Sequence, residues 1–99
     1  MTMMTEFDVS RVSVEERWAD IISVKRRNIK DMSAVEFVWK YIQGPFGRAH
    51  TWIASRKNSG DAIGAASIFP REVYVRGVPV LGAIAGDFSI DKEFRSIPA

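Results

Sequence analysis

Apolar residues in the first half of the chain recur at helical spacing behind two capping signals. Ser13 is followed three residues later by Glu16, and Ser33 by Glu36, which is the S-x-x-E pattern of a helix N-terminus. The pattern predicts two helices, each with one apolar face toward a sheet, and the second ends at Gly44-Pro45. The predicted apolar faces are Val14, Trp18, Ile21 and Ile22 with the stem of Lys25 in the first helix, and Phe37, Val38, Tyr41 and Ile42 in the second.

From His50 onward the apolar residues alternate with small or polar ones, as in half-buried strands. The first predicted strand covers residues 51–56, and residues 58–61 read as a hairpin turn. The second strand runs from about Ala62 to Val75. We expect an interruption near Phe69-Pro70, because proline cannot donate to the hydrogen-bond ladder.

The last predicted strand is rich in small residues. It follows a turn at Arg76-Gly77 and runs from about Val80 to Ile90, with Gly82, Ala83, Ala85 and Gly86 within it. Such residues weaken a strand unless another backbone or a ligand must come close, so they are a first sign of a site. The predicted fold class is α+β, with two N-terminal helices followed by an antiparallel β meander, in a single domain that covers residues 1–99.

Composition agrees with one small globular domain. Of the 99 residues, 46% are hydrophobic and 26% are charged, which argues against a disordered or fibrous chain. The sequence has no apolar run near the roughly 20 residues that span a bilayer, and no basic start followed by an apolar stretch. The chain also has no cysteine, which excludes disulfides and thiolate zinc sites, and a cytoplasmic location is the default expectation.

Charge does not identify a partner, because the net charge is only +2 and both signs are mixed along the chain. The dense basic stretch Lys25-Arg26-Arg27, with Lys30, could contact nucleic acid or anionic lipid. We favour a solvated helix C-terminus, where cations oppose the negative end of the helix dipole. We therefore expect neither a nucleic-acid nor a membrane partner.

Several kinds of catalytic site are missing from the sequence. His50 is the single histidine, which excludes a two-histidine metal site, and no metal is expected. No Gly-x-Ser-x-Gly elbow and no complete nucleotide-binding glycine loop occurs. His50 borders a predicted strand and is expected to be a surface residue.

Three segments between Trp39 and Arg95 resemble a branch of the GNAT (Gcn5-related N-acetyltransferase) superfamily. They read W-K-Y-I-Q-G-P-F-G, then A-I-G-A-A-S-I-F-P-R, then A-G-D-F-S-I-D-K-E-F-R, in this order. The resemblance is to the N-terminal half of a GNAT fold, and it implies an N-acyltransferase. The co-substrate would be acetyl-CoA or another acyl-CoA, and the acceptor an amine.

The resemblance also implies where the acyl-CoA binds. In GNAT enzymes a bulge splays two central strands, and the pantetheine arm adds to the opened strand; here that slot is Phe88-Ser89-Ile90. Arg95 and Ser96 would open the loop that binds the pyrophosphate through backbone N–H groups. No glycine follows Arg95, although the family places one there, so we expect a truncated GNAT domain that is inactive as an isolated chain.

Candidate residues for the transfer step come from the same resemblance. Asp87 would be the base, although an aspartate after a strand glycine can equally hold a bulge or a neighbouring loop. The main-chain amide near Ile90 would donate to the oxyanion. Trp39, Tyr41 and Phe46 would line the acceptor site, but aromatic residues at helical spacing are more often core residues.

A second class of function is open. The last predicted strand would be an exposed edge, and exposed edges pair with other chains. The alternative to an enzyme is a small α+β interaction or dimerisation module, in which the chain forms a homo-oligomer through that edge. Nucleic-acid binding through the basic stretch ranks third.

Overall fold

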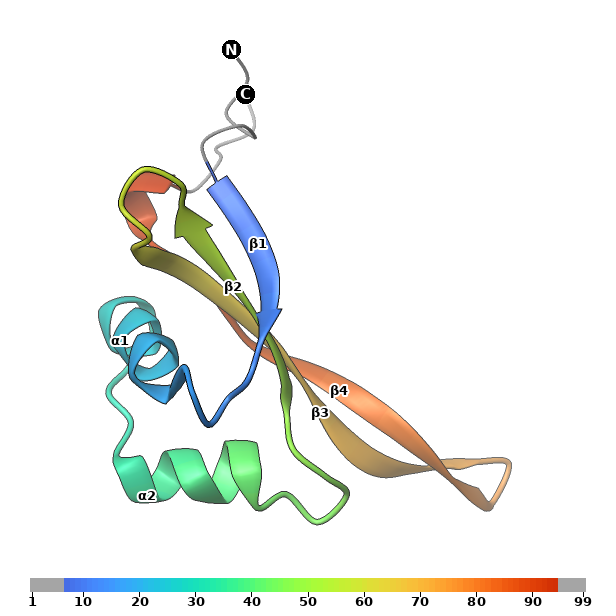
Figure 1. The fold of residues 1–99 in the computed structure, drawn as a ribbon. Coiled ribbons are helices and arrows are strands. Elements are labelled where there is room, and N and C mark those ends of the chain that lie inside the picture. Colours follow the sequence, from blue (N-terminus) through green and yellow to red (C-terminus); the bar gives the residue numbers. More distant parts are fainter. Residues whose placement is uncertain (1–6, 95–99) are drawn as a thin grey trace.

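A computed structural model of the chain describes residues 7–94, and its architecture is a four-stranded antiparallel sheet with two helices (Figure 1). The strands stand in chain order, β1-β2-β3-β4, as in a meander. The elements are β1 (Phe7–Val12), α1 (Trp18–Asn28), α2 (Ala34–Phe37) with its π-helical continuation (Val38–Ile42), β2 (His50–Arg56), β3 (Ala62–Val75), β4 (Val78–Ile90) and a 3₁₀ turn (Lys92–Phe94).

The fold class is confirmed as α+β, but a strand precedes the helices, so the prediction of two N-terminal helices was wrong in this respect. β1 pairs antiparallel with β2, from Phe7 opposite Arg56 to Val12 opposite Thr51. It lies at the edge of the sheet, and its four central residues are exposed. Most side chains of β1 do not enter the core, so the sequence of this segment lacks a clear strand pattern. The segment forms a strand by pairing with the edge of β2.

The two capping boxes behave differently. Ser33 is the N-cap of α2, and its Oγ accepts a hydrogen bond from the Glu36 amide at 3.1 Å, as predicted. Ser13 accepts from the Glu16 amide at 3.4 Å, but the chain there forms a single turn, closed by the Arg17 amide on the Ser13 carbonyl at 3.0 Å, and α1 begins only at Trp18. The first predicted helix therefore starts later than its capping signal indicates.

The core lies between the two helices and one face of the sheet, which confirms that both apolar stripes face the strands. Ile53 of β2 and Phe69 of β3 meet Ile21 of α1 and Tyr41 of the π-helical segment. Trp18 and Val38 are exceptions, because their side chains are 49% and 37% exposed and neither joins this core. The buried core residues are Val14, Ile21, Ile22, Met32, Phe37, Tyr41, Ala49, Ile53 and Phe69.

β3 and β4 form a long hairpin whose far end extends beyond the other strands (Figure 1). The turn residues Arg76 and Gly77 have φ of 52° and 79°, as in a type I′ turn, so the predicted turn is confirmed. The expected interruption at Phe69-Pro70 was wrong, since Pro70 pairs with Ala83 inside a continuous ladder. Pro70 is tolerated because the pairing of β2 with β3 ends at Ile68, which leaves β3 without a neighbour on that side.

Candidate functional site

A β-bulge interrupts the pairing of β4 with β3. Ser67 lies opposite Gly86 and Ala65 opposite Ser89, so β4 contains one residue more than β3 between these pairs. Within the bulge Asp87 has a φ of 50°, a conformation that aspartate tolerates better than most residues. A bulge of this kind, next to the proposed slot, is what the GNAT resemblance implies.

Asp87 is the centre of a charged cluster that joins the bulge to both helical segments. Its Oδ2 accepts hydrogen bonds from Lys25 Nζ at 2.9 Å and from the Tyr41 hydroxyl at 2.5 Å, and its Oδ1 accepts from Lys40 Nζ at 3.0 Å. The exposed fractions of the side chains are 7% for Lys25, 13% for Asp87 and 37% for Lys40. The carboxylate is therefore nearly enclosed, and Lys40 is the one donor that reaches water.

The surroundings of Asp87 stabilise its charged form. Burial raises the pKa of the carboxyl, but hydrogen bonds from Tyr41, Lys25 and Lys40 outweigh burial, and the pKa of Asp87 is lowered. Burial, with the hydrogen bond to Asp87, raises the pKa of the Tyr41 hydroxyl. At neutral pH the cluster thus holds a carboxylate and a neutral phenol. A carboxylate with a lowered pKa and three donors is a weak proton acceptor, which favours the structural role of Asp87; its role as a base remains a prediction.

The segment Phe88–Ile90 borders an apolar cavity. Phe88 is 74% exposed, whereas Ser89 is buried and Ile90 is half-buried. The cavity has a volume of about 230 Å³, and its other walls are Val9, Trp52, Ala54, Gly64, Ala65 and Ala66. Trp52 and Ala54 flank Ile53, which points into the core, so this cavity lies on the face of the sheet opposite the helices.

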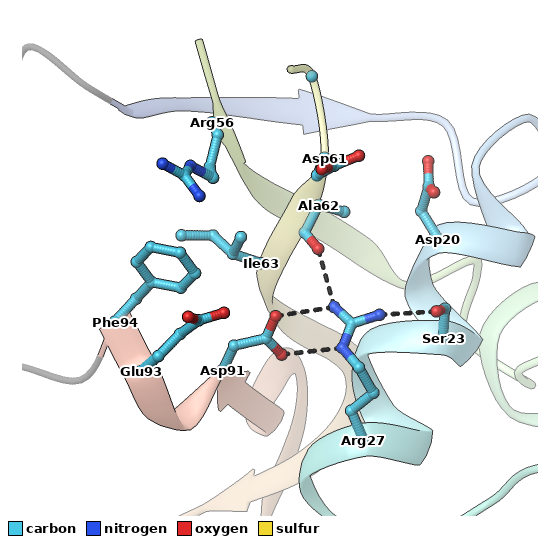
Figure 2. A pocket seen from close by; sticks show the side chains of 11 residues that line it. Asp20, Ser23, Arg27, Arg56, Asp61, Ala62, Ile63, Asp91, Glu93 and Phe94 are labelled. Carbon is cyan, nitrogen blue, oxygen red and sulfur yellow. Dashed lines mark hydrogen bonds and ion pairs between the residues drawn. The ribbon is translucent and has the colours of Figure 1, made fainter. Parts of the chain in front are cut away.

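A second cavity lies between α1 and the neighbouring ends of β2, β3 and β4 (Figure 2). Arg27 crosses it and binds both carboxylate oxygens of Asp91, with Nε–Oδ1 at 3.1 Å and Nη2–Oδ2 at 3.0 Å. The same guanidinium donates to the carbonyl of Ala62 and to the hydroxyl of Ser23, each at 2.8 Å. Arg27 therefore ties α1 to the ends of β3 and β4. The cavity holds about 360 Å³ and is lined by Asp20, Ser23, Arg27, Arg56, Gly60, Asp61, Ala62, Ile63, Asp91, Glu93 and Phe94.

Each residue of the basic stretch Lys25-Arg26-Arg27 forms an ion pair within the chain, and Lys25 alone is buried. Lys25 pairs with Asp87, Arg27 with Asp91, and Arg26 with Asp31 at 2.8 Å. The expectation of a solvated helix end was therefore wrong for Lys25, whose side chain is almost fully buried. Sequence reasoning could not find the pairs of Lys25 and Arg27, because the carboxylates of Asp87 and Asp91 lie more than 60 residues away along the chain.

The three aromatic candidates for the acceptor site lie in different environments. Tyr41 is buried, stacks on Phe37 at a centroid distance of 4.6 Å and meets Phe69 edge-on at 5.2 Å. Trp39 and Phe46 are 75% and 41% exposed. Burial makes Tyr41 a core residue, and it leaves Trp39 and Phe46 accessible to an acceptor.

Two candidate residues, Arg95 and Ser96, lie outside the described residues. Within residues 7–94, no group of three or more histidine, cysteine or acidic side chains is arranged to hold a metal ion. No helix in that range is long and apolar enough to cross a bilayer.

No protein-family model matches the sequence, and no curated protein matches it. Two solved structures match the fold. Saccharomyces cerevisiae N-myristoyltransferase, with bound myristoyl-CoA, superposes with a TM-score of 0.74 and 16% identity over 97% of this chain. A Trypanosoma brucei acetyltransferase superposes with a TM-score of 0.56 and 13% identity over 91% of this chain.

Both matched proteins are GNAT members, and both are longer than this chain. The chain spans 24% of the N-myristoyltransferase and 63% of the acetyltransferase. At these identities the match concerns the fold. The chain therefore has the GNAT-type fold that the sequence resemblance implied, with a strand ahead of its two helices.

Proposed function

We propose that the chain is the acyl-CoA-binding part of a GNAT-type N-acyltransferase, which transfers an acyl group from acyl-CoA to an amine. The observation that carries this proposal is the bulge at Asp87, directly beside the apolar cavity along Phe88–Ile90. The GNAT fold supports it, as does the myristoyl-CoA bound by the matched N-myristoyltransferase.

The bulge and the cavity suit the two chemically different parts of the ligand. β4 has no neighbouring strand on its outer side in the described part of the chain, so the amide groups of a pantetheine arm can add along Phe88–Ile90 as a further strand. The cavity beside it is lined by apolar side chains, which suits the acyl group. Arg95 and Ser96 would then bind the pyrophosphate, and the acyl group can be acetyl or longer.

In the transfer step the amine nitrogen attacks the thioester carbonyl, the carbon–sulfur bond breaks, and the CoA thiolate leaves. The amine must lose a proton, which a base or the departing thiolate accepts. Asp87 is held by three hydrogen-bond donors, so we expect it to accept this proton poorly. Trp39 and Phe46 are the exposed candidates for contact with the acceptor. We expect the 99-residue chain to bind acyl-CoA with little or no turnover.

The test is calorimetric titration of the chain with acetyl-CoA and with myristoyl-CoA. Phe88→Ala removes an exposed wall of the cavity and should weaken binding roughly tenfold, because the ligand loses an aromatic contact. Tyr74→Ala is the matched control, since Tyr74 is also an exposed aromatic residue but lies outside the cavity and should not change the affinity. A folded chain that binds neither ligand would contradict the proposal, and so would equal effects of the two substitutions.

The second candidate function is an interaction module. The observation that favours it is the outer edge of β4, which no strand covers within residues 7–94, together with the apolar residues on the hairpin.

A further inference from the structure

The outer part of the β3–β4 hairpin, residues 69–85, forms an arm that exposes apolar side chains on both faces. The segment Val78–Gly86 contains no charged residue. A folded monomer would keep these side chains in water, and a large exposed apolar surface usually marks an interaction site. The exposed large residues of the arm are Tyr74, Val75, Val78, Val80, Leu81 and Ile84.

The edge of β4 is open to pairing over a defined length. The two-residue turn makes Val75 and Val78 a hydrogen-bonded pair, so the even-numbered residues of β4 from Val78 to Gly86 bond to β3. The backbone groups of the odd-numbered residues in this segment then point away from β3. Pro79 lacks an N–H group, and the bulge at Asp87 disrupts the strand, so both stop pairing. Between them Leu81, Ala83 and Ala85 offer complete outward N–H and C=O groups.

We propose that this edge pairs with the same edge of a second copy of the chain, antiparallel, about a two-fold axis at Ala83. A two-fold interface uses the same surface on both subunits, and a register centred on Ala83 uses the whole segment between Pro79 and Asp87. In this register Leu81 of one chain exchanges backbone hydrogen bonds with Ala85 of the other chain. At the axis, the Ala83 residues of the two chains exchange backbone hydrogen bonds with one another.

Side-chain sizes along the edge are complementary in this register. Each pair away from the axis joins a large residue to a small one: Leu81 to Ala85, Val80 to Gly86, and Ile84 to Gly82. Two large residues never stand opposite each other, and no like charges meet, because the segment is uncharged. Gly82 is also needed for the pairing of β4 with β3, because a Cβ at this position would lie 2.9 Å from the side chain of Val73.

The ends of the pairing favour the same partner. The antiparallel alignment places Arg76, at the tip of one arm, opposite Ile90 of the other copy, three residues before the acidic Glu93. Natural sheets protect open edges with charged side chains, and this segment has none. The ladder itself lies on the tip side of the bulge, but the same register brings residues 76–78 of one copy opposite Phe88–Ile90 of the other, so dimerisation and acyl-CoA should compete for this end of β4.

The experiment measures the mass of the chain in solution by sedimentation equilibrium. We expect the wild type to be a dimer. Ala83→Lys and Ala83→Glu each place two like charges opposite one another at the axis, and each variant alone should be monomeric. An equimolar mixture of the two variants should dimerise again, because an ammonium group on one copy then faces a carboxylate on the other. Tyr74→Lys is the control, since it adds a charge to the same arm outside the ladder between the copies and should remain dimeric.

The outcomes separate the proposal from its alternatives. A monomeric wild type at micromolar concentration would overturn it. Dimers of Ala83→Lys would place the interface elsewhere, and a mixture that stays monomeric would overturn the axis at Ala83. Recovery of the dimer in the mixture cannot come from misfolded variants, so this result supports the register directly.

Discussion

The carboxylate of Asp87 joins the bulge of β4 to α1 and to the π-helical segment through three side-chain hydrogen bonds. Lys25 contributes an almost fully buried ammonium group, which is tolerable only beside a carboxylate. The position also requires a positive φ, which aspartate and asparagine accept more readily than other residues. Sequence reasoning selected Asp87 but could not choose between a base and a structural anchor, since its partners are brought to it by folding.

Asp87→Asn removes the charge but keeps the shape and the tolerance of a positive φ. We expect the free energy of unfolding to fall by about 3 kcal/mol, because the substitution leaves the Lys25 ammonium buried without a counter-ion. Urea denaturation at pH 7 measures this change. Lys40→Met is the matched control: Lys40 is 37% exposed, so its loss should cost less than about 1 kcal/mol. Equal costs would show that Lys25 does not depend on Asp87.

The pH dependence of stability should reflect both groups of the cluster. The pKa of Asp87 is lowered by folding, so its contribution is present above the unfolded value of about 4 and is lost as the pH falls through the lower folded value. The pKa of Tyr41 is raised, so its contribution is present below about pH 10 and is lost at more alkaline pH.

Thermal melts across pH measure these two losses of stability, which form the acid and alkaline limbs of a plot of melting temperature against pH. Asp87→Asn should flatten the acid limb, and Tyr41→Phe should flatten the alkaline limb while leaving a carboxylate at position 87. An unchanged acid limb in Asp87→Asn would mean that other carboxyl groups control the acid transition.

At the level of helices and strands, the two capping motifs show how far a local signal reaches. Both S-x-x-E motifs read alike in sequence, but Ser33 directly precedes α2, whereas Ser13 precedes a turn. The difference arises because Ser13 directly follows β1, so the segment after it must first turn the chain from β1 to α1. The apolar pattern around Ser13 did not predict β1, and so it did not predict this connection. The hairpin turn, in contrast, is specified by Arg76 and Gly77 themselves.

Removal of the two serine caps should therefore have unequal effects. Ser33→Ala should lower the free energy of unfolding by about 1 kcal/mol, because the Glu36 amide loses its acceptor at the start of α2. Ser13→Ala should cost less, since its hydrogen bond to Glu16 is longer and does not cap α1. Chemical denaturation of both variants compares them; a larger cost for Ser13 would show that α1 extends to Ser13 in solution.

In the molecule as a whole, the sheet has one face covered by the helices and one face with an apolar cavity, and its arm extends away from both. The matched GNAT proteins are longer than this chain. A chain with an open, uncharged edge can gain stability from a second copy, which covers backbone groups and apolar side chains together.

If the edge pairs as proposed, the melting temperature of the wild type should rise with protein concentration, because dimerisation stabilises the folded state by mass action. The melting temperature of Ala83→Lys should be independent of concentration. Scanning calorimetry over a wide concentration range tests both. A wild type whose melting temperature does not change would indicate that the monomer unfolds on its own.

Local patterns in the chain were enough to predict the two helices, the three meander strands and the turn at Arg76-Gly77, because periodicity, caps and turn residues act within a few neighbours. The GNAT resemblance also indicated Asp87 and the segment Phe88–Ile90. Three features required the folded molecule: the existence of β1, the continuity of β3 through Pro70, and the partners of Lys25 and Arg27. Each of these depends on contacts between segments far apart in the chain, whose formation no local pattern encodes.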